Sequence, residues 1–576
     1  GSEMCIRDRV RKAHSVSHIH SMAYVSGPAP MMFRVNTSAP ATTTEHPRPA
    51  ARRVRRPRRP RGLHGTPPPA APRQYRWGRG DTWSTAIIAV LALFTRFIGL
   101  TNPVSKGSPV FDEKHYVPQA WDMVRSWDSP FLGGIELNPG YGLVVHPPLG
   151  KQILALSEAV FGYTPLGWRF ATALFGAGTV VMVMALARRI SLSWQVAAFA
   201  GFIACFDGVL LVSSKFGMLD IFQVFFITAA AWALARDHHQ MHERLHRAYV
   251  RDGLGTSEYG PRFGFRWWRF TAGVFLGLAL AVKWSGLYFI AAFGLLTVFS
   301  DLALRRRYGV RRYVAGTVLR DVAPAFASIV ILPAALYVWS WRAWFSSETA
   351  VYRHAKEDGT IEAGSLLNLL PDSVANWLYY HKTVLEFHAS LTSSGGHHHP
   401  WDSKPWAWLV GARPVLYYSS TDAECAGGQE CRRMLMLFGT PVIWWIIVPV
   451  LIWALWSLTV RRDRRFLIPL VGFAAGFFPW LVGFDRQMYF FYAAAFIPFV
   501  IVAIALILGQ LSGRGREVPW RALRTLAGGH LRTGTLAVIV YLCAVLAMFV
   551  YFSPLLYGFL IPESWYNSLM WLPSWH

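Results

Sequence analysis

Apolar runs near the length of a membrane-spanning helix dominate the chain, and charged or turn residues separate them. A helix needs about 20 apolar residues to cross a hydrocarbon core, and about eleven runs approach that length. They lie near residues 83–100, 166–187, 193–212, 219–235, 268–282, 285–303, 322–341, 437–459, 466–483, 489–510 and 534–552. The pattern predicts an all-α polytopic membrane protein with about 11 transmembrane helices.

The short loops between these runs alternate in positive charge. Basic clusters such as "ARRI", "RRRYGVRR" and "RRDRR" follow every second run, whereas loops of the opposite parity hold few Lys or Arg. The positive-inside rule therefore predicts a cytoplasmic N-terminus and an outside C-terminus. It also places two long polar segments, residues 101–165 and 342–436, outside the membrane. We expect the functional residues there.

Composition supports a membrane protein with a basic N-terminal arm. Of the 576 residues, 53% are hydrophobic and 15% are charged. The net charge of +25 would suggest nucleic acid for a soluble protein, but here much of it follows the membrane topology. Residues 1–80 hold 16 of the 57 Lys and Arg against three acids. We predict a disordered cytoplasmic arm that contacts anionic lipid rather than nucleic acid, followed by one membrane domain over residues 81–576.

Two adjacent carboxylates, Asp112 and Glu113, stand out in "FDEKHY", together with His115 and Tyr116. They follow the first apolar run closely, so we expect them near the outer membrane surface. Neighbouring acids repel each other when both are ionised, which raises the pKa of one and suits a proton acceptor. A solvated pair of loop charges, or a charge at a helix N-terminus, is the alternative interpretation.

A second polar motif, "HPPLGKQ", begins at His146 and includes Lys151. Its two prolines fix the backbone before a predicted helix that lies in the membrane interface. Arg169 opens the next apolar run. Three basic groups near two acids form a candidate phosphate site. The alternative is that each cation, at the end of a membrane-spanning helix, only extends its charged group into water.

Four further charged residues lie at the predicted outside ends of apolar runs. Lys215 and Asp220 belong to "SSKFGMLD", Lys283 to "AVKWSG" and Arg486 to "FDRQMYFFY". The cations are candidates for binding a lipid phosphate or for reaching into water. An acid within a membrane segment is a candidate functional group, although pairing with a lysine or capping a helix explains Asp220 equally well.

Cysteines and histidines in the second outside segment invite two structural hypotheses. Cys425 and Cys431 lie in a predicted outside loop, where oxidation is allowed, and we expect them to form a disulfide. The "HHHP" run, even with His381, His388 and Asp402, lacks the spacing of a tetrahedral metal site. We therefore expect no metal there.

The ordered set of "FDE", "HPPLGK", an Arg opening the next run, "SSKFGMLD" and "AVKWSGLYF" resembles the protein O-mannosyltransferase family over about residues 83–552. Residues 397–418 are similar to the same segment of bacterial members, and the chain lacks the β-trefoil insertion of eukaryotic members. The resemblance implies a GT-C-type glycosyltransferase fold with interfacial helices in the first outside loop.

The resemblance also implies an activity: transfer of mannose, with inversion, from polyprenyl-phosphate mannose to Ser or Thr of exported polypeptides outside a bacterial plasma membrane. Asp112 would deprotonate the acceptor, Glu113 would position a substrate and Arg169 would hold the donor phosphate. Lys215 replaces the family's usual Arg, which leaves its role open. No cofactor is expected because the donor contains no diphosphate, and dependence on a divalent metal stays open. The secretion channel is the expected source of acceptor chains.

Two other functions remain compatible with the sequence. A related transferase would move another sugar, such as arabinose, from the same kind of lipid carrier to a glycan or lipid. A secondary transporter would instead show inverted repeats and broken helices with acids at the middle of the membrane. The acids found here lie in predicted outside segments, which favours a transferase.

Overall fold

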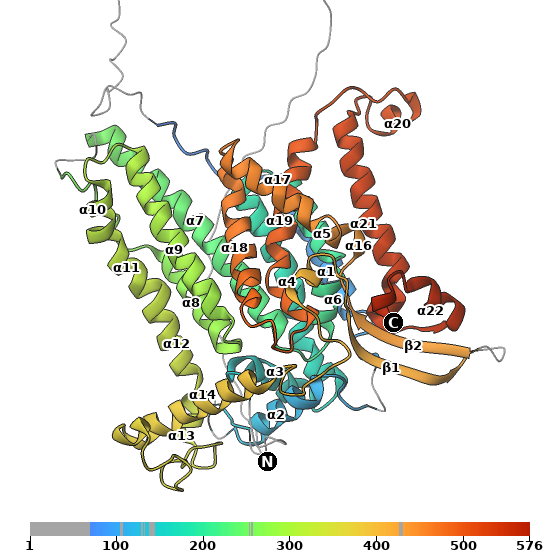
Figure 1. The fold of residues 1–576 in the computed structure, drawn as a ribbon. Helices are drawn as coiled ribbons and strands as arrows, with labels where there is room; N and C mark the ends of the chain where they lie inside the picture. The colour runs from blue at the N-terminus through green and yellow to red at the C-terminus, as the bar shows by residue number, and fades with distance from the viewer. Residues whose placement is uncertain are drawn as a thin grey trace, which may run out of the picture. The chain divides into compact units, whose positions relative to one another are not determined.

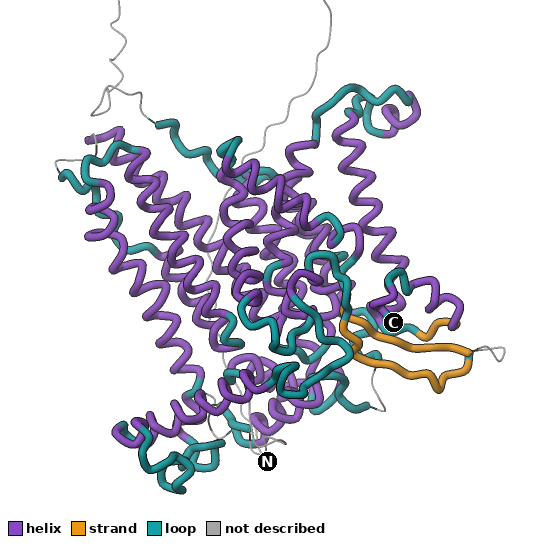
Figure 2. The backbone as a smooth tube through the Cα atoms, in the orientation of Figure 1, coloured by secondary structure: helices purple, strands orange, loops and turns teal. Residues whose placement is uncertain are grey.

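The fold is that of a computed structural model, which describes residues 69–576 apart from short gaps. Most of the predicted N-terminal arm lies outside the described residues. Helices dominate the described part of the chain, and many of them run side by side (Figures 1 and 2). The gaps are residues 104–106, 128, 130, 132, 137–144, 253, 255–256 and 426–429.

Long apolar helices form a bundle in which neighbours along the chain often pack together, as α7 packs on both α4 and α8. Within the described residues, five helices are long and apolar enough to cross a membrane, or six if the bent pair α5 and α6 is one span. The bundle contains α1 (Arg79–Phe97), α4 (Pro165–Ser191), α5 (Trp194–Cys205), α6 (Gly208–Lys215), α7 (Asp220–Asp252), α8 (Trp267–Val282), α9 (Gly286–Arg307), α10–α12 (Tyr313–Ser340), α16 (Pro441–Trp444), α17 (Ile447–Thr459), α18 (Leu467–Phe477), α19 (Ile497–Leu511) and α21 (Thr533–Tyr557).

Helices occur in every apolar run that the sequence predicts, but several runs are interrupted. The run over residues 193–212 becomes α5 and α6, which are bent by 60°. In residues 489–510, a 3₁₀ turn at Phe490–Ala495 precedes α19. Apolar composition predicts burial in lipid or protein, but it does not predict where a helix bends. The predicted number of spans is therefore not confirmed.

Three helices outside the apolar runs gather at one end of the bundle: α2 (Glu113–Arg125), α3 (Leu149–Phe161) and α14 (Asp372–Ser390). In Figure 1, α14 runs across the lower end of the long helices. α3 starts directly after Pro147 and Pro148, as expected because a proline has the backbone angle of a first helical turn. α3 packs on α2, α4 and α8, so the "HPPLGK" motif is held against the bundle.

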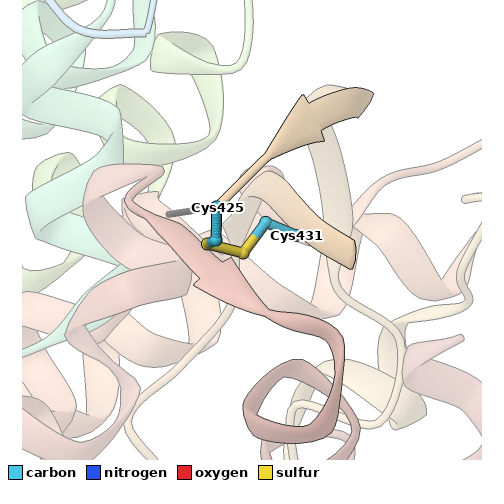
Figure 3. Close-up of a disulfide and its surroundings, with 2 residues drawn as sticks. All are labelled: Cys425 and Cys431. Carbon is cyan, nitrogen blue, oxygen red and sulfur yellow. A yellow bond between two sulfur atoms is a disulfide. The ribbon is translucent and has the colours of Figure 1, made fainter. Parts of the chain in front are cut away.

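A three-stranded sheet replaces the helical structure expected of an all-α chain. β1 (Val415–Glu424) pairs antiparallel with β2 (Glu430–Leu437), and β2 pairs antiparallel with β3 (Leu560–Pro562). Val, Tyr and Thr residues in β1 favour extended backbone, which the apolar-run analysis did not weigh. Cys425 and Cys431 form a disulfide at the far end of the hairpin, with 5.6 Å between their Cα atoms (Figure 3).

Short elements complete the described chain. They are α13 (Arg342–Ser346), the 3₁₀ turn at Leu366–Leu369, α15 (Pro405–Trp408), the 3₁₀ turns at Arg464–Phe466 and Phe478–Leu481, α20 (Arg521–Leu526), α22 (Glu563–Leu569) and the 3₁₀ turn at Pro573–Trp575. α22 contacts both β2 and β3.

Candidate active site

A cavity of about 960 Å³ lies where α2 and α14 meet the bundle. Its wall comes from the start of α2, the turn before α3, the starts of α7 and α9, α14, and residues 486–492. Aromatic and aliphatic side chains make up much of the lining. The ionisable side chains in the wall, tyrosines apart, are Asp112, Asp220, Lys283, Arg486, His115, His146, His381 and His388.

Asp112 lies immediately before α2 and contributes its carboxyl group to the cavity. Burial raises the pKa of Asp112 to about 6, against the opposing effects of the Lys283 charge and a hydrogen bond from the Tyr116 hydroxyl. The nearby Asp220 carboxylate adds to the rise in pKa. At neutral pH the group is therefore ionised, and it accepts a proton more readily than an ordinary aspartate does.

Lys283 and Asp220 form an ion pair in the cavity wall. Lys283 lies at the turn between α8 and α9, and its Nζ atom is 2.8 Å from Asp220 Oδ1. An ammonium group has three donors, and this pair uses one of them. Gln223 supports the turn because its side-chain amide donates to the Lys283 carbonyl oxygen at 2.9 Å. Lys283 is thus a fixed cation with donors left for a ligand.

Arg486 lines the same cavity without a carboxylate partner among the described residues. Its guanidinium lies 5.8 Å from the ring centre of Trp480, and its Nη2 atom lies 3.4 Å from His388 Nδ1. The buried Nε atom has no hydrogen-bond partner in the described part of the chain. A guanidinium with unused donors beside a cavity is suited to a phosphate oxygen.

The histidines in the wall are neutral at physiological pH. Burial lowers the pKa of His146 well below its usual value, and the Lys283 charge lowers it further. Burial and the Arg486 charge lower the pKa of His388 to about 4. Their rings stack with centres 6.0 Å apart. The charge available to an anionic ligand therefore comes from Lys283 and Arg486.

A hydrogen-bonded chain of aromatic residues fixes the wall beside α14. His381 Nδ1 lies 2.7 Å from the Trp377 carbonyl oxygen, so it carries the proton and leaves Nε2 to accept from the Tyr337 hydroxyl at 2.5 Å. Trp284 Nε1 donates to the Tyr337 oxygen at 2.8 Å. The sequence does not single out Trp284, Tyr337 or Gln223 as residues of the site. Gln223 could have been found, because an uncharged polar side chain within an apolar run indicates a polar contact in the folded chain.

Glu113 and Arg169 do not line the cavity, so their predicted roles stay predictions. Both side chains are fully buried, and Arg169 Nε and Nη2 lie 2.7 and 2.8 Å from the two Glu113 oxygens. The other three guanidinium N–H groups face the carbonyl oxygens of Leu100, Asn102 and Pro103. Arg169 has five donors and all are used. It therefore has no donor left for a phosphate, and the pair instead ties α2 to α4.

Two other predicted phosphate ligands also point elsewhere. Lys151 is buried and forms an ion pair with Glu136. The Lys215 ammonium donates to the carbonyl oxygens of Arg96, in the last turn of α1, and of Ile98, directly after it. The two Lys215 contacts satisfy carbonyl groups that the end of a helix leaves unpaired, which is a structural task. Neither lysine lines the cavity. Their predicted phosphate-binding role therefore gains no support from the cavity and stays a prediction.

Family models match most of the chain. Residues 86–345 match the model described as dolichyl-phosphate-mannose-protein mannosyltransferase, and residues 373–575 match the C-terminal four TMM region of protein-O-mannosyltransferase. A polyprenol-phosphate-mannose–protein mannosyltransferase of Corynebacterium glutamicum is 64% identical, with 88% of this chain and 96% of the relative covered. The protein of the same name from Mycobacterium tuberculosis H37Rv is 45% identical, with 85% of this chain and 91% of the relative covered.

A solved structure shows the same fold. The Saccharomyces cerevisiae protein O-mannosyltransferase Pmt1-Pmt2 complex bound to the sugar donor matches with a TM-score of 0.63. The match covers 87% of this chain and 93% of that chain at 15% sequence identity. The likeness shows that the two chains share one fold.

Proposed function

Because the chain belongs to the protein O-mannosyltransferase family, we propose that it transfers mannose from polyprenyl-phosphate mannose to Ser or Thr hydroxyls of polypeptides. It is a multi-pass membrane glycosyltransferase. The observation that carries the proposal is the cavity in which Asp112, a half-buried carboxylate, shares a wall with the cations Lys283 and Arg486. A base and a pair of phosphate-binding cations are what this transfer requires.

In the proposed reaction, the acceptor hydroxyl gives its proton to Asp112 while its oxygen forms a bond to the anomeric carbon of mannose. The bond between that carbon and the phosphate oxygen breaks, and polyprenyl phosphate leaves with the electron pair. Lys283 and Arg486 stabilise the negative charge that grows on the phosphate. Attack opposite the leaving group would invert the anomeric configuration.

The cavity lining also suits a lipid-linked donor. Leu287, Leu385 and Leu391 lie in the same wall as the charged residues, together with Trp480 and Phe491. An isoprenoid next to the phosphate would bury its apolar surface against these side chains. The proposed donor therefore meets apolar surface and cations in one cavity.

We place the cavity on the outside of a bacterial plasma membrane, with the N-terminus in the cytoplasm. The alternating basic loops support this orientation, and so does a disulfide, which persists in oxidising compartments. An unfolded polypeptide leaving the secretion channel would be the natural acceptor, because an extended segment can bring its hydroxyl to the membrane surface.

Transfer should proceed without a divalent metal because Lys283 and Arg486 can neutralise a single phosphate. Purified protein treated with EDTA and then dialysed should keep its rate of transfer. Loss of activity that Mg²⁺ or Mn²⁺ restores would contradict this part of the proposal.

The experiment that tests the function compares acceptors. Purified protein receives polyprenyl-phosphate mannose with a labelled sugar and either a Ser/Thr-rich peptide, the same peptide with every Ser and Thr replaced by Ala, or a glycan acceptor. We expect label only in the first peptide. Label in the glycan alone would favour a glycan-modifying transferase and overturn the proposal.

A further inference from the structure

A second cavity, of about 660 Å³, lies further along α7 and α9, two of the helices that line the first. His239 and His242 of α7 contribute to it, as does Arg307 at the end of α9. The starts of these two helices line the candidate active site, where Asp220 and Leu287 lie. About 20 residues at 1.5 Å each separate the two places along α9, which is about 30 Å, one hydrocarbon thickness. The second cavity therefore lies at the other membrane surface.

Arginines dominate the polar wall of this second cavity. Arg73, Arg307 and Arg461 are exposed and form no ion pair with any described residue. Arg465 pairs with Asp463 at 2.6 Å, so that carboxylate is already neutralised. Three guanidinium groups that share one cavity without a local counter-charge repel each other. A bound anion would relieve that repulsion.

The rest of the wall favours a phosphate group carried by an amphipathic molecule. The ring Nε2 atom of His242 is buried and has no hydrogen-bond partner among the described residues, so a polar group in the wall is unsatisfied. Ile190, Leu192 and Pro72 supply apolar surface next to the arginines. Guanidinium groups bind phosphate oxygens in pairs, and basic pockets between membrane helices bind anionic headgroups.

We propose that this second cavity binds a phosphate-bearing anion, with an anionic phospholipid headgroup as the natural source at a membrane surface. The site is independent of the sugar-transfer cavity because it lies further along α7 and α9 and shares no lining residue with it. Occupation would clamp the middle of α7 to the end of α9, to the residues before α1 and to the loop after α17, all of which contribute to its wall.

The test uses the full chain in phosphatidylcholine nanodiscs and follows thermal unfolding by tryptophan fluorescence. One arm adds cardiolipin or phosphatidylglycerol to the disc, and the other adds inorganic pyrophosphate to the buffer. A ligand that binds only the folded state raises Tm with its concentration. Whichever arm raises Tm identifies the source of the phosphate, and no rise in either arm overturns the proposal.

Two double variants distinguish binding in the cavity from nonspecific attraction to the positive charge of this surface. Arg307→Gln with Arg461→Gln removes two charges from the wall, whereas Arg306→Gln with Arg462→Gln removes two exposed charges next to them that do not line it. We expect the first variant to weaken the apparent affinity about tenfold or more and the second to change it less than about twofold. Equal losses in both variants, or no loss in the first, would overturn the proposal.

Discussion

At the scale of the residue, Asp112 and Glu113 are neighbours with opposite surroundings. Asp112 faces a cavity, whereas Glu113 accepts hydrogen bonds from the guanidinium of Arg169 and from the backbone N–H groups of Val110 and Gly217. Successive positions at a helix point about 100° apart, so two adjacent acids rarely share one environment. The sequence predicts the acidic pair, but only the packed structure shows which acid lines the cavity.

The elevated pKa of Asp112 predicts the pH dependence of transfer. Since the ionised form is the base, activity should fall about tenfold per unit as pH drops below about 6 and stay level above it. The Tyr116 hydroxyl hydrogen-bonds to the ionised form, so Tyr116→Phe should shift this fall to higher pH. Rates measured from pH 4.5 to 8 in both proteins test this. An unshifted profile in Tyr116→Phe would contradict the assignment.

Arg486 should determine how tightly the donor binds. Arg486→Gln removes a charged contact to phosphate, so the KM for the lipid donor should rise roughly ten- to a hundredfold. Arg342→Gln is the matched control, because Arg342 also stacks on a tryptophan, Trp339, but does not line the cavity. Donor titrations at fixed acceptor measure both. An equal donor KM in the two variants would show that Arg486 does not bind the donor phosphate.

At the scale of the element, the lengths of the apolar runs and the charges of the loops predict where the helices lie. The bends and connections between the helices are less predictable. The prolines before α3 were read correctly as a helix start. The hairpin of β1 and β2 was missed because its residues follow no spanning pattern, and the bend between α5 and α6 falls inside a continuous apolar run. Such joints depend on contacts between distant segments, which a single sequence does not display.

The Glu113–Arg169 pair joins two such elements and should affect stability rather than donor binding. Arg169→Leu would leave a buried carboxylate without its partner, which costs about 3–5 kcal/mol. We expect a lower Tm and a lower yield of folded protein, with an unchanged donor KM in whatever folds. Scanning fluorimetry combined with donor titration distinguishes the two roles. Normal stability with a much raised KM would return Arg169 to the phosphate site.

At the scale of the whole molecule, two cavities that lie about 20 residues apart along α7 and α9 give the chain two distinct surfaces. The basic loops predict that the surface with Asp112 faces outward. With Cys5 and the exposed Cys543 changed to Ser, Cys205 is buried and Cys425 and Cys431 are joined in a disulfide, so Lys114→Cys adds one reactive thiol. That thiol should react with an impermeant maleimide in intact cells. A cysteine at Arg462 should react only after permeabilisation. The reverse pattern would contradict the proposed orientation.

The central claim is that the carboxylate of Asp112 in the cavity wall takes the acceptor proton. Asp112→Asn keeps the shape of the side chain and removes its ability to accept a proton, and Asp358→Asn makes the same change at an exposed position outside the cavity. Single-turnover transfer from labelled polyprenyl-phosphate mannose to a Ser/Thr peptide compares them directly. The account predicts a loss of at least about a hundredfold for Asp112→Asn, with donor affinity retained, and a normal rate for Asp358→Asn. Transfer at the normal rate by Asp112→Asn would contradict it.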